Sequence, residues 1–211
     1  NAEQRGIAVA TSKPMGRSAV RFPKPETKNR RMITELNEGW KTWLIDNSKG
    51  NHQYPIINCQ IPHNWDDYYG YRQLTHGNLH GTAMYVKDFS LDNYPLSTVN
   101  SQLKKRYFLR FEGVGTYATI KVNGHDFGRY PVGRTTLTLD VTDALKQGTN
   151  RLEAKAEHPE MIADMPWVCG GCSSEWGFSE GSQPLGIFRP VVLEATDEIR
   201  IEPFGVHIWN D

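Results

Sequence analysis

The most constraining feature of this sequence is a block of three short runs in which apolar and polar side chains alternate. The runs cover residues 106–111, 117–122 and 135–141. A period of two sends successive side chains to opposite faces of a pleated strand, so each run predicts a strand with one buried face. Asn123-Gly124 lies between the second and third runs, and this pair readily takes the positive φ angles of a tight hairpin. The core of the chain is therefore predicted to be antiparallel β.

Further segments with strand character lie on both sides of this block. Ala83–Leu91 is apolar on both faces near its start, which predicts a central strand. One short helical turn is predicted at 142–148, with Thr142 as its cap and Gly148 at its end. Short strands at regular spacing, with little helix, favour a sandwich of two antiparallel sheets. The other predicted strands are Gly39–Leu44, Arg151–Glu157, Ile187–Ala195 and Ile199–Ile208.

Length and composition narrow the function classes. The 211 residues suit one large β domain or two small ones, and we expect a partly irregular leader at 1–31 followed by one domain at 32–211. The 24 basic residues balance 24 acidic ones, so no nucleic-acid partner is expected. No apolar run approaches the roughly 20 residues that span a bilayer, so no membrane partner is expected. Aromatic residues make up 11% of the chain, which suits a β-sandwich that handles carbohydrate.

The three cysteines argue against a disulfide framework, because their number is odd. Cys169 and Cys172 form a Cys-Gly-Gly-Cys motif, which is compatible with half of a zinc site, a redox pair or a local disulfide. Zinc needs two more ligands, of which only His158 is near, and a thioredoxin-type pair opens a helix that glycines and serines do not favour. We expect two thiols that shape a compact loop, with no metal site and no cofactor.

Eight segments follow one another in a characteristic order and end in Gly186-Ile187-Phe188-Arg189. They are Trp40, Ile61–Trp65, Gly81–Phe89, Arg106–Val114, Val122–Gly124, Leu139–Thr142, Gly148–Asn150 and Gly186–Val191. In this order they resemble the N-terminal sugar-binding domain of glycoside hydrolase family 2, which includes β-galactosidases, β-glucuronidases and β-mannosidases. The resemblance extends from about Leu36 to Ile208, and the ordered set rather than any single motif carries it.

The resemblance implies an all-β fold, a galactose-binding-like jelly roll built as an antiparallel β-sandwich. In the family this domain precedes an immunoglobulin-like sandwich and a (β/α)8 barrel that carries the catalytic glutamates. The expected partners are therefore carbohydrate and the missing catalytic barrel of the same polypeptide. No residue of this chain is expected to be catalytic, and no hydrolysis is expected from it alone. A structural calcium ion is compatible with this fold, although no cluster of acidic residues in the sequence indicates where it would bind.

A free-standing carbohydrate-binding module with the same fold is the alternative, and it would need an open aromatic platform. A periplasmic or secreted bacterial location fits an enzyme that degrades polysaccharides, whereas the free cysteines weigh against it. The sugar is not specified by this sequence, because in the family the barrel selects it.

The stretch Asp164–Gly186 is the expected site of contact with sugar. The strands of a sandwich are occupied with one another, so its loops meet a ligand. Two tryptophans offer flat apolar faces to the C–H side of a pyranose, and three carboxylates offer acceptors to its hydroxyls. In the alternative reading, the tryptophans only close the edge of the sandwich. The predicted carbohydrate-binding residues are Asp164, Trp167, Glu175, Trp176 and Glu180.

Two further residues are expected to be structural. Trp65 ends the turn Ile61–Trp65. This turn resembles a catalytic motif at first sight, because His63 lies close in sequence to Asp66 and Asp67. The matching turn of the family is structural, with Asn64 here where aspartate is common, so we expect Trp65 to be packed. Arg189 carries a guanidinium fork that is expected to pair with a carboxylate or to hold loop carbonyls.

Overall fold

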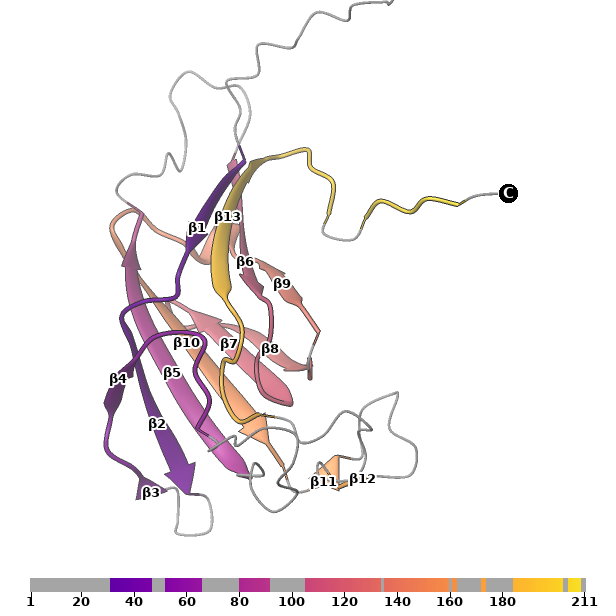
Figure 1. The fold of residues 1–211 in the computed structure, drawn as a ribbon. Coiled ribbons are helices and arrows are strands. Elements are labelled where there is room, and N and C mark those ends of the chain that lie inside the picture. Colours follow the sequence, from indigo (N-terminus) through magenta and orange to yellow (C-terminus); the bar gives the residue numbers. More distant parts are fainter. Residues whose placement is uncertain are drawn as a thin grey trace, which may run out of the picture.

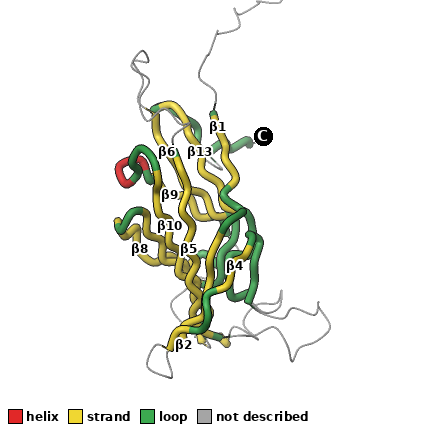
Figure 2. The backbone as a smooth tube through the Cα atoms, turned by 90° about the vertical axis from the view of Figure 1, so that its left-hand side faces the viewer, coloured by secondary structure: helices red, strands yellow, loops and turns green. Residues whose placement is uncertain are grey.

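The computed structural model describes residues 31–46, 52–65, 80–91, 105–133, 135–159, 161–162, 172–173, 184–202 and 205–209. Two antiparallel sheets make up most of this part of the chain and pack face to face (Figure 1). Figure 2 shows the sandwich after a quarter turn, with its short 3-10 helix in red. The predicted all-β antiparallel sandwich is confirmed.

Four strands form the smaller sheet in the order β1-β13-β6-β9, and seven form the larger one along β3-β2-β5-β10-β7-β8, with β4 paired to β2. β5 lies between β2 and β10, so the prediction of a central strand is confirmed. The smaller sheet comprises β1 (Met32–Glu35), β13 (Val191–Asp197), β6 (Lys105–Phe111) and β9 (Leu137–Asp140). The larger comprises β3 (His52–Gln53), β2 (Trp40–Asp46), β4 (Ile57–Cys59), β5 (Gly81–Ser90), β10 (Thr149–His158), β7 (Tyr117–Val122) and β8 (His125–Pro131). Also present are the ladder of β11 (Met161–Ile162) with β12 (Cys172–Ser173) and the 3-10 helix η2 (Thr142–Ala144).

The core lies between the two sheets and is built by the alternating runs. In β7, Ala118, Ile120 and Val122 are buried, and the residues between them are more exposed or polar. Each large apolar side chain removed from water contributes about 1.5–3 kcal/mol, so the shared apolar layer drives the sheets together. The largest fully buried side chains include Trp40, Tyr85, Tyr107, Leu109, Phe111, Ile120, Leu152 and Leu193.

Asn150 is a fully buried amide whose hydrogen-bonding capacity is filled. Its Nδ2 donates to the carbonyl oxygens of Lys146 and Gly148, at 2.8 and 2.9 Å. Its Oδ1 accepts from the Lys146 amide at 2.9 Å and from Nδ2 of Asn123 at 2.7 Å. Asn123 also forms the predicted hairpin turn, with φ of 51° followed by 83° at Gly124. The network therefore joins the β7–β8 turn to the chain that enters β10.

Two local expectations are wrong, and the strand β8 was missed. The strand predicted at Ile199–Ile208 is wrong for its described residues, because Ile199 and Ile201 are 88% and 73% exposed and no strand is assigned there. Thr142 does not cap η2; its hydroxyl donates to Oδ1 of Asp140, and Val141 occupies the cap position without a side-chain bond. β8 was not predicted, because its side chains are exposed or half-buried throughout and show no alternation.

Within the part of the chain that the structure describes, no helix has the length and apolar character needed to cross a membrane.

Replacing Asn150 with alanine is expected to lower the free energy of unfolding by about 3 kcal/mol. The substitution leaves buried donors and acceptors of neighbouring residues without partners, and each costs about 1–3 kcal/mol. Urea denaturation of the chain measures the loss. Asn58→Ala, on the exposed edge strand β4, is the matched control and should change stability by less than about 0.5 kcal/mol. Equal losses in the two variants would contradict the assignment.

Candidate functional site at one end of the sandwich

Two long connections meet the sandwich at the same end. The start of β5 lies beside the end of β10 near the bottom of Figure 1, and Gly81 and His158 are paired there. Residues 66–79 precede His80, and residues 160–183 follow Pro159 in the chain. The rings of His80 and His158 lie 4.9 Å apart between their centroids. This end therefore receives both connections, including the stretch predicted to contact sugar.

The chain that returns from that stretch is held by backbone hydrogen bonds on both sides. We call residues 184–188 the anchor segment. On one side, Trp65 N–H donates to the Leu185 carbonyl at 2.9 Å, and His63 N–H donates to the Ile187 carbonyl at 2.7 Å. On the other, Gly115 N–H donates to the Gly186 carbonyl at 2.6 Å. Leu185 and Ile187 are fully buried, so the anchor segment is part of the core.

Gly186 sits where no side chain fits. Its φ is +152°, and an added Cβ would lie 2.5 Å from the His63 carbonyl oxygen and 2.6 Å from the Tyr85 hydroxyl. Atoms at those separations overlap, and both neighbours are themselves packed in place. The glycine is therefore required by a close approach of three segments that are distant in the sequence.

A chain of four side chains supports this crossing. Nε1 of Trp65 donates to the Thr42 hydroxyl at 3.0 Å. Thr42 and the Ile187 backbone are hydrogen-bonded to the Tyr85 hydroxyl, and both bonds favour its ionised form, as donors to its oxygen do. We infer that the Tyr85 proton points to Nδ1 of His63, 2.8 Å away. Burial raises the pKa of Tyr85 and lowers that of His63, so both are neutral near pH 7.

The structure places the two residues expected to be structural at the ends of the anchored region. Trp65 is half-buried against the core, and its ring meets the His63 ring edge to face at 5.5 Å. Arg189 is exposed, and its backbone N–H donates to the Gly113 carbonyl at 3.3 Å. The aliphatic part of Arg189 lies over Gly113, where an added Cβ would come within 2.9 Å of its Cδ.

The five residues predicted to bind carbohydrate lie outside the described residues, so the structure places only the segments that flank them. The sequence pattern did not predict that Thr42, Tyr85 and His63 come together. The signal that was available is Gly186 at the head of the Gly-Ile-Phe-Arg motif. The sequence-predicted residues concerned are Asp164, Trp167, Glu175, Trp176 and Glu180.

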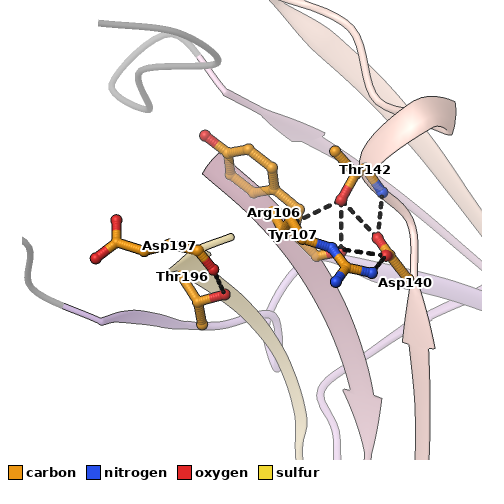
Figure 3. Close-up of polar contacts among 6 residues, drawn as sticks. All are labelled: Arg106, Tyr107, Asp140, Thr142, Thr196 and Asp197. Carbon is orange, nitrogen blue, oxygen red and sulfur yellow. Dashed lines mark hydrogen bonds and ion pairs between the residues drawn. The ribbon is translucent and has the colours of Figure 1, made fainter. Parts of the chain in front are cut away.

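A second polar cluster lies on the outer face of the smaller sheet (Figure 3). Arg106 donates to Oδ2 of Asp140 through Nε, at 3.1 Å, and through Nη2. Oδ1 of Asp140 accepts from the Thr142 amide at 3.1 Å and from its hydroxyl at 2.5 Å. Desolvation raises the pKa of Asp140, but the hydrogen bonds from Thr142 and Arg106 outweigh it and leave the pKa below its ordinary value.

Among the described residues, no group of three or more histidine, cysteine, aspartate or glutamate side chains is placed to hold a metal ion. Cys59 is a free, half-buried cysteine, and burial raises the pKa of its thiol to about 11. A protonated thiol is a poor ligand and nucleophile near pH 7. Cys169 lies outside the described residues, and only the backbone of Cys172 is described.

Comparisons with known proteins agree with this fold. The family model described as the glycosyl hydrolase 2 galactose-binding domain-like matches residues 66–165. A β-glucuronidase of Bacteroides fragilis is 34% identical over 100 residues, which cover 47% of this chain and 13% of that protein. A β-glucuronidase of Formosa agariphila is 25% identical over 195 residues, which cover 83% of this chain and 18% of that protein. The solved structure of a β-glucuronidase from an uncultured Clostridium species superposes with a TM-score of 0.57 at 25% identity, over 84% of this chain and 30% of that one.

Replacing Gly186 with alanine is expected to destabilise the chain much more than replacing Gly128. Both glycines have positive φ, +152° and +97°, so each pays a backbone strain of about 1–3 kcal/mol. An added Cβ meets nothing within 4 Å at Gly128 but overlaps two groups at Gly186. The difference between the two unfolding free energies therefore isolates the overlap, and we expect at least about 2 kcal/mol. Equal losses of unfolding free energy in the two variants would show that the backbone at Gly186 does not approach His63 and Tyr85 so closely.

The neutral state of His63 predicts a pH dependence. Because burial lowers its pKa below 6.5, the unfolded chain binds this proton more readily than the folded chain does. The contribution of His63 to stability is present above pH 6.5 and decreases as the pH falls below that value, by at most about 1.4 kcal/mol per pH unit. His63→Asn keeps an acceptor for the Tyr85 hydroxyl but does not titrate. Urea denaturation from about pH 7.5 to 5.5 should give a flatter profile for the variant; parallel profiles would refute this role.

Proposed function

We propose that the chain is the non-catalytic N-terminal part of a longer hydrolase that acts on β-glycosides, because residues 66–165 match the galactose-binding-like domain of glycoside hydrolase family 2 and the fold resembles that of a β-glucuronidase. Its role is to support the catalytic domain of the same polypeptide and to shape the sugar pocket of that domain. The chain spans 13% and 18% of the length of the two β-glucuronidases described above, which supports the proposal that a separate part of the polypeptide performs the reaction.

The observation that carries this proposal is the construction of the anchor segment. A mobile loop can be tethered by one or two contacts, whereas residues 184–188 are bonded on both sides, and Leu185 and Ile187 are buried in the core. The start of the predicted sugar-contacting stretch follows β10, the central partner of both β5 and β7. A stretch that leaves one rigid element and returns into another is well suited to hold side chains at a fixed distance from a neighbouring domain.

The chemistry of the described carboxylates supports a non-catalytic role. Glycoside hydrolysis by retention uses two carboxyl groups about 5 Å apart, and one of them needs a raised pKa to act as the acid. In the outer-face cluster, Asp140 has a lowered pKa and is fixed by Arg106 and Thr142, which is the opposite of what a general acid requires. Five further described carboxylates are also engaged in ion pairs with lysine or arginine. These are Asp126, Glu153, Glu157, Glu194 and Asp197.

Within this proposal, the stretch 164–183 supplies the contacts to the sugar. Trp167 and Trp176 offer ring faces to the apolar side of a pyranose, while Asp164, Glu175 and Glu180 accept hydrogen bonds from its hydroxyls. Such contacts adjust affinity and orientation and leave bond cleavage to the catalytic domain.

Purified chain is expected to give no turnover of nitrophenyl β-D-glucuronide or nitrophenyl β-D-galactoside. In the complete polypeptide, Trp167→Ala and Trp176→Ala are each expected to lower kcat/KM about tenfold, equivalent to about 1.4 kcal/mol of lost binding. Tyr54→Ala, at an exposed position before β4, is the control and should leave kcat/KM unchanged. Turnover by the isolated chain that disappears on substitution of a carboxylate within it would overturn the proposal.

A further inference from the structure

A pocket of about 390 Å³ opens on the outer face of the smaller sheet, away from the anchor segment. It lies between the edge strand β9 and residues 200–202, which follow β13, with Phe108 of β6 between them. Small-molecule sites have volumes of roughly 300–1,000 Å³, so the space suits a ligand of modest size. The polar residues that line this outer-face pocket are Arg106, Arg200, Asp140, Glu202, Thr136 and Thr138.

We propose that the outer-face pocket binds a neutral hexopyranoside unit of a glycan. Nothing in the comparisons assigns a ligand to this face, and the proposal concerns a different surface from the one that bears the predicted sugar-contacting stretch.

Three of the four charged groups of the pocket are held in place before any ligand arrives: Arg106, Asp140 and Arg200. The guanidinium of Arg200 lies 3.2 Å from the centroid of the Phe108 ring, and that of Arg106 lies 5.1 Å from it. Arg106 is fixed further by Asp140, which Thr142 holds in turn (Figure 3). Phe108 is consequently buried although it points away from the core, which sequence alternation alone did not predict. Groups that are already ordered lose little conformational entropy when they bind.

The lining has no excess of charge, since two guanidinium groups face two carboxylates. A phosphate or a uronate would gain from Arg106 and Arg200 but be repelled by Asp140 and Glu202, and a cation would meet the reverse. A sugar hydroxyl both donates and accepts a hydrogen bond, so it can use a carboxylate and a guanidinium at once. The hydroxyls of Thr136 and Thr138 add further partners, and their methyl groups offer apolar contact.

The side of the pocket formed by β9 is open for such a ligand. β9 is the last strand of the smaller sheet, so no further strand covers its side within the described chain. The side chain of Arg106 is 42% exposed, whereas that of Arg200 is only 11% exposed. A ligand would therefore meet Arg106, Asp140 and the threonines first, with Arg200 at the back. Without a free aromatic face, we expect weak binding, in the millimolar range.

Calorimetric titration of the full chain with methyl β-D-galactopyranoside tests the proposal. We expect a dissociation constant of about 1–10 mM. Thr138→Val removes one hydroxyl at nearly constant volume and should weaken binding about three- to tenfold. Thr119→Val is the matched control, because its buried hydroxyl lies on the other sheet without a hydrogen-bond partner, and it should bind as the parent does.

A substitution that changes the charge of the pocket provides a second test. Glu202→Gln gives the pocket one excess positive charge, so binding of D-glucuronate should strengthen several-fold relative to the galactoside. The proposal is overturned by absence of saturable binding at about 50 mM galactoside, by equal affinity of the parent and Thr138→Val, or by a parent chain that prefers glucuronate. Each outcome is read on the chain itself and does not depend on hydrolysis, so it can fail while the proposed function stands.

Discussion

The arrangement of this sandwich depends on one close approach, the passage of the Gly186 backbone against the His63 carbonyl and the Tyr85 hydroxyl. A hydrogen atom fits at Gly186 and a methyl group does not. Because the passage is tight, the backbone on either side can bond to two neighbouring segments at once. The buried phenol of Tyr85 completes it by meeting polar groups that would otherwise lack partners in the core. The anchor segment is therefore held from both sides where the chain re-enters the core.

The two sheets differ in the side chains that their outer faces present to solvent. On the larger sheet, β10 carries Arg151, Glu153 and Glu157, which form ion pairs across or along the strands, as expected of a solvated surface. On the smaller sheet, arginines lie over an aromatic ring and leave a polar pocket. Surface ion pairs add little to stability, typically about 0–1 kcal/mol each. The ion pairs on the larger sheet are therefore typical of an ordinary solvent-exposed face. The ordered arginines and Asp140 on the smaller sheet are better suited to bind a ligand.

Local patterns predicted much of the fold. Alternation located β6, β7 and β9 because each has one face in the core between the sheets, and Asn123-Gly124 located a turn because both residues have positive φ. β8 has no buried face, so alternation did not predict it. The described residues of Ile199–Ile208 pair with no neighbouring strand, and an alternating pattern does not indicate whether such a partner exists. The anchor is harder still, since Thr42, Tyr85, His63 and Gly186 meet only through long-range pairing. Their spacing along the chain contains no trace of that contact.

The central claim is that the anchor segment belongs to the stable core and provides a fixed end for the stretch that we propose to contact sugar. Native-state hydrogen exchange of the amides of Trp65, His63 and Gly115, which bond to that segment, tests it most directly. We predict that these amides exchange only through global unfolding, with the same free energy as amides in the centre of β5 and β10. Exchange through a local opening of much lower free energy would contradict the account.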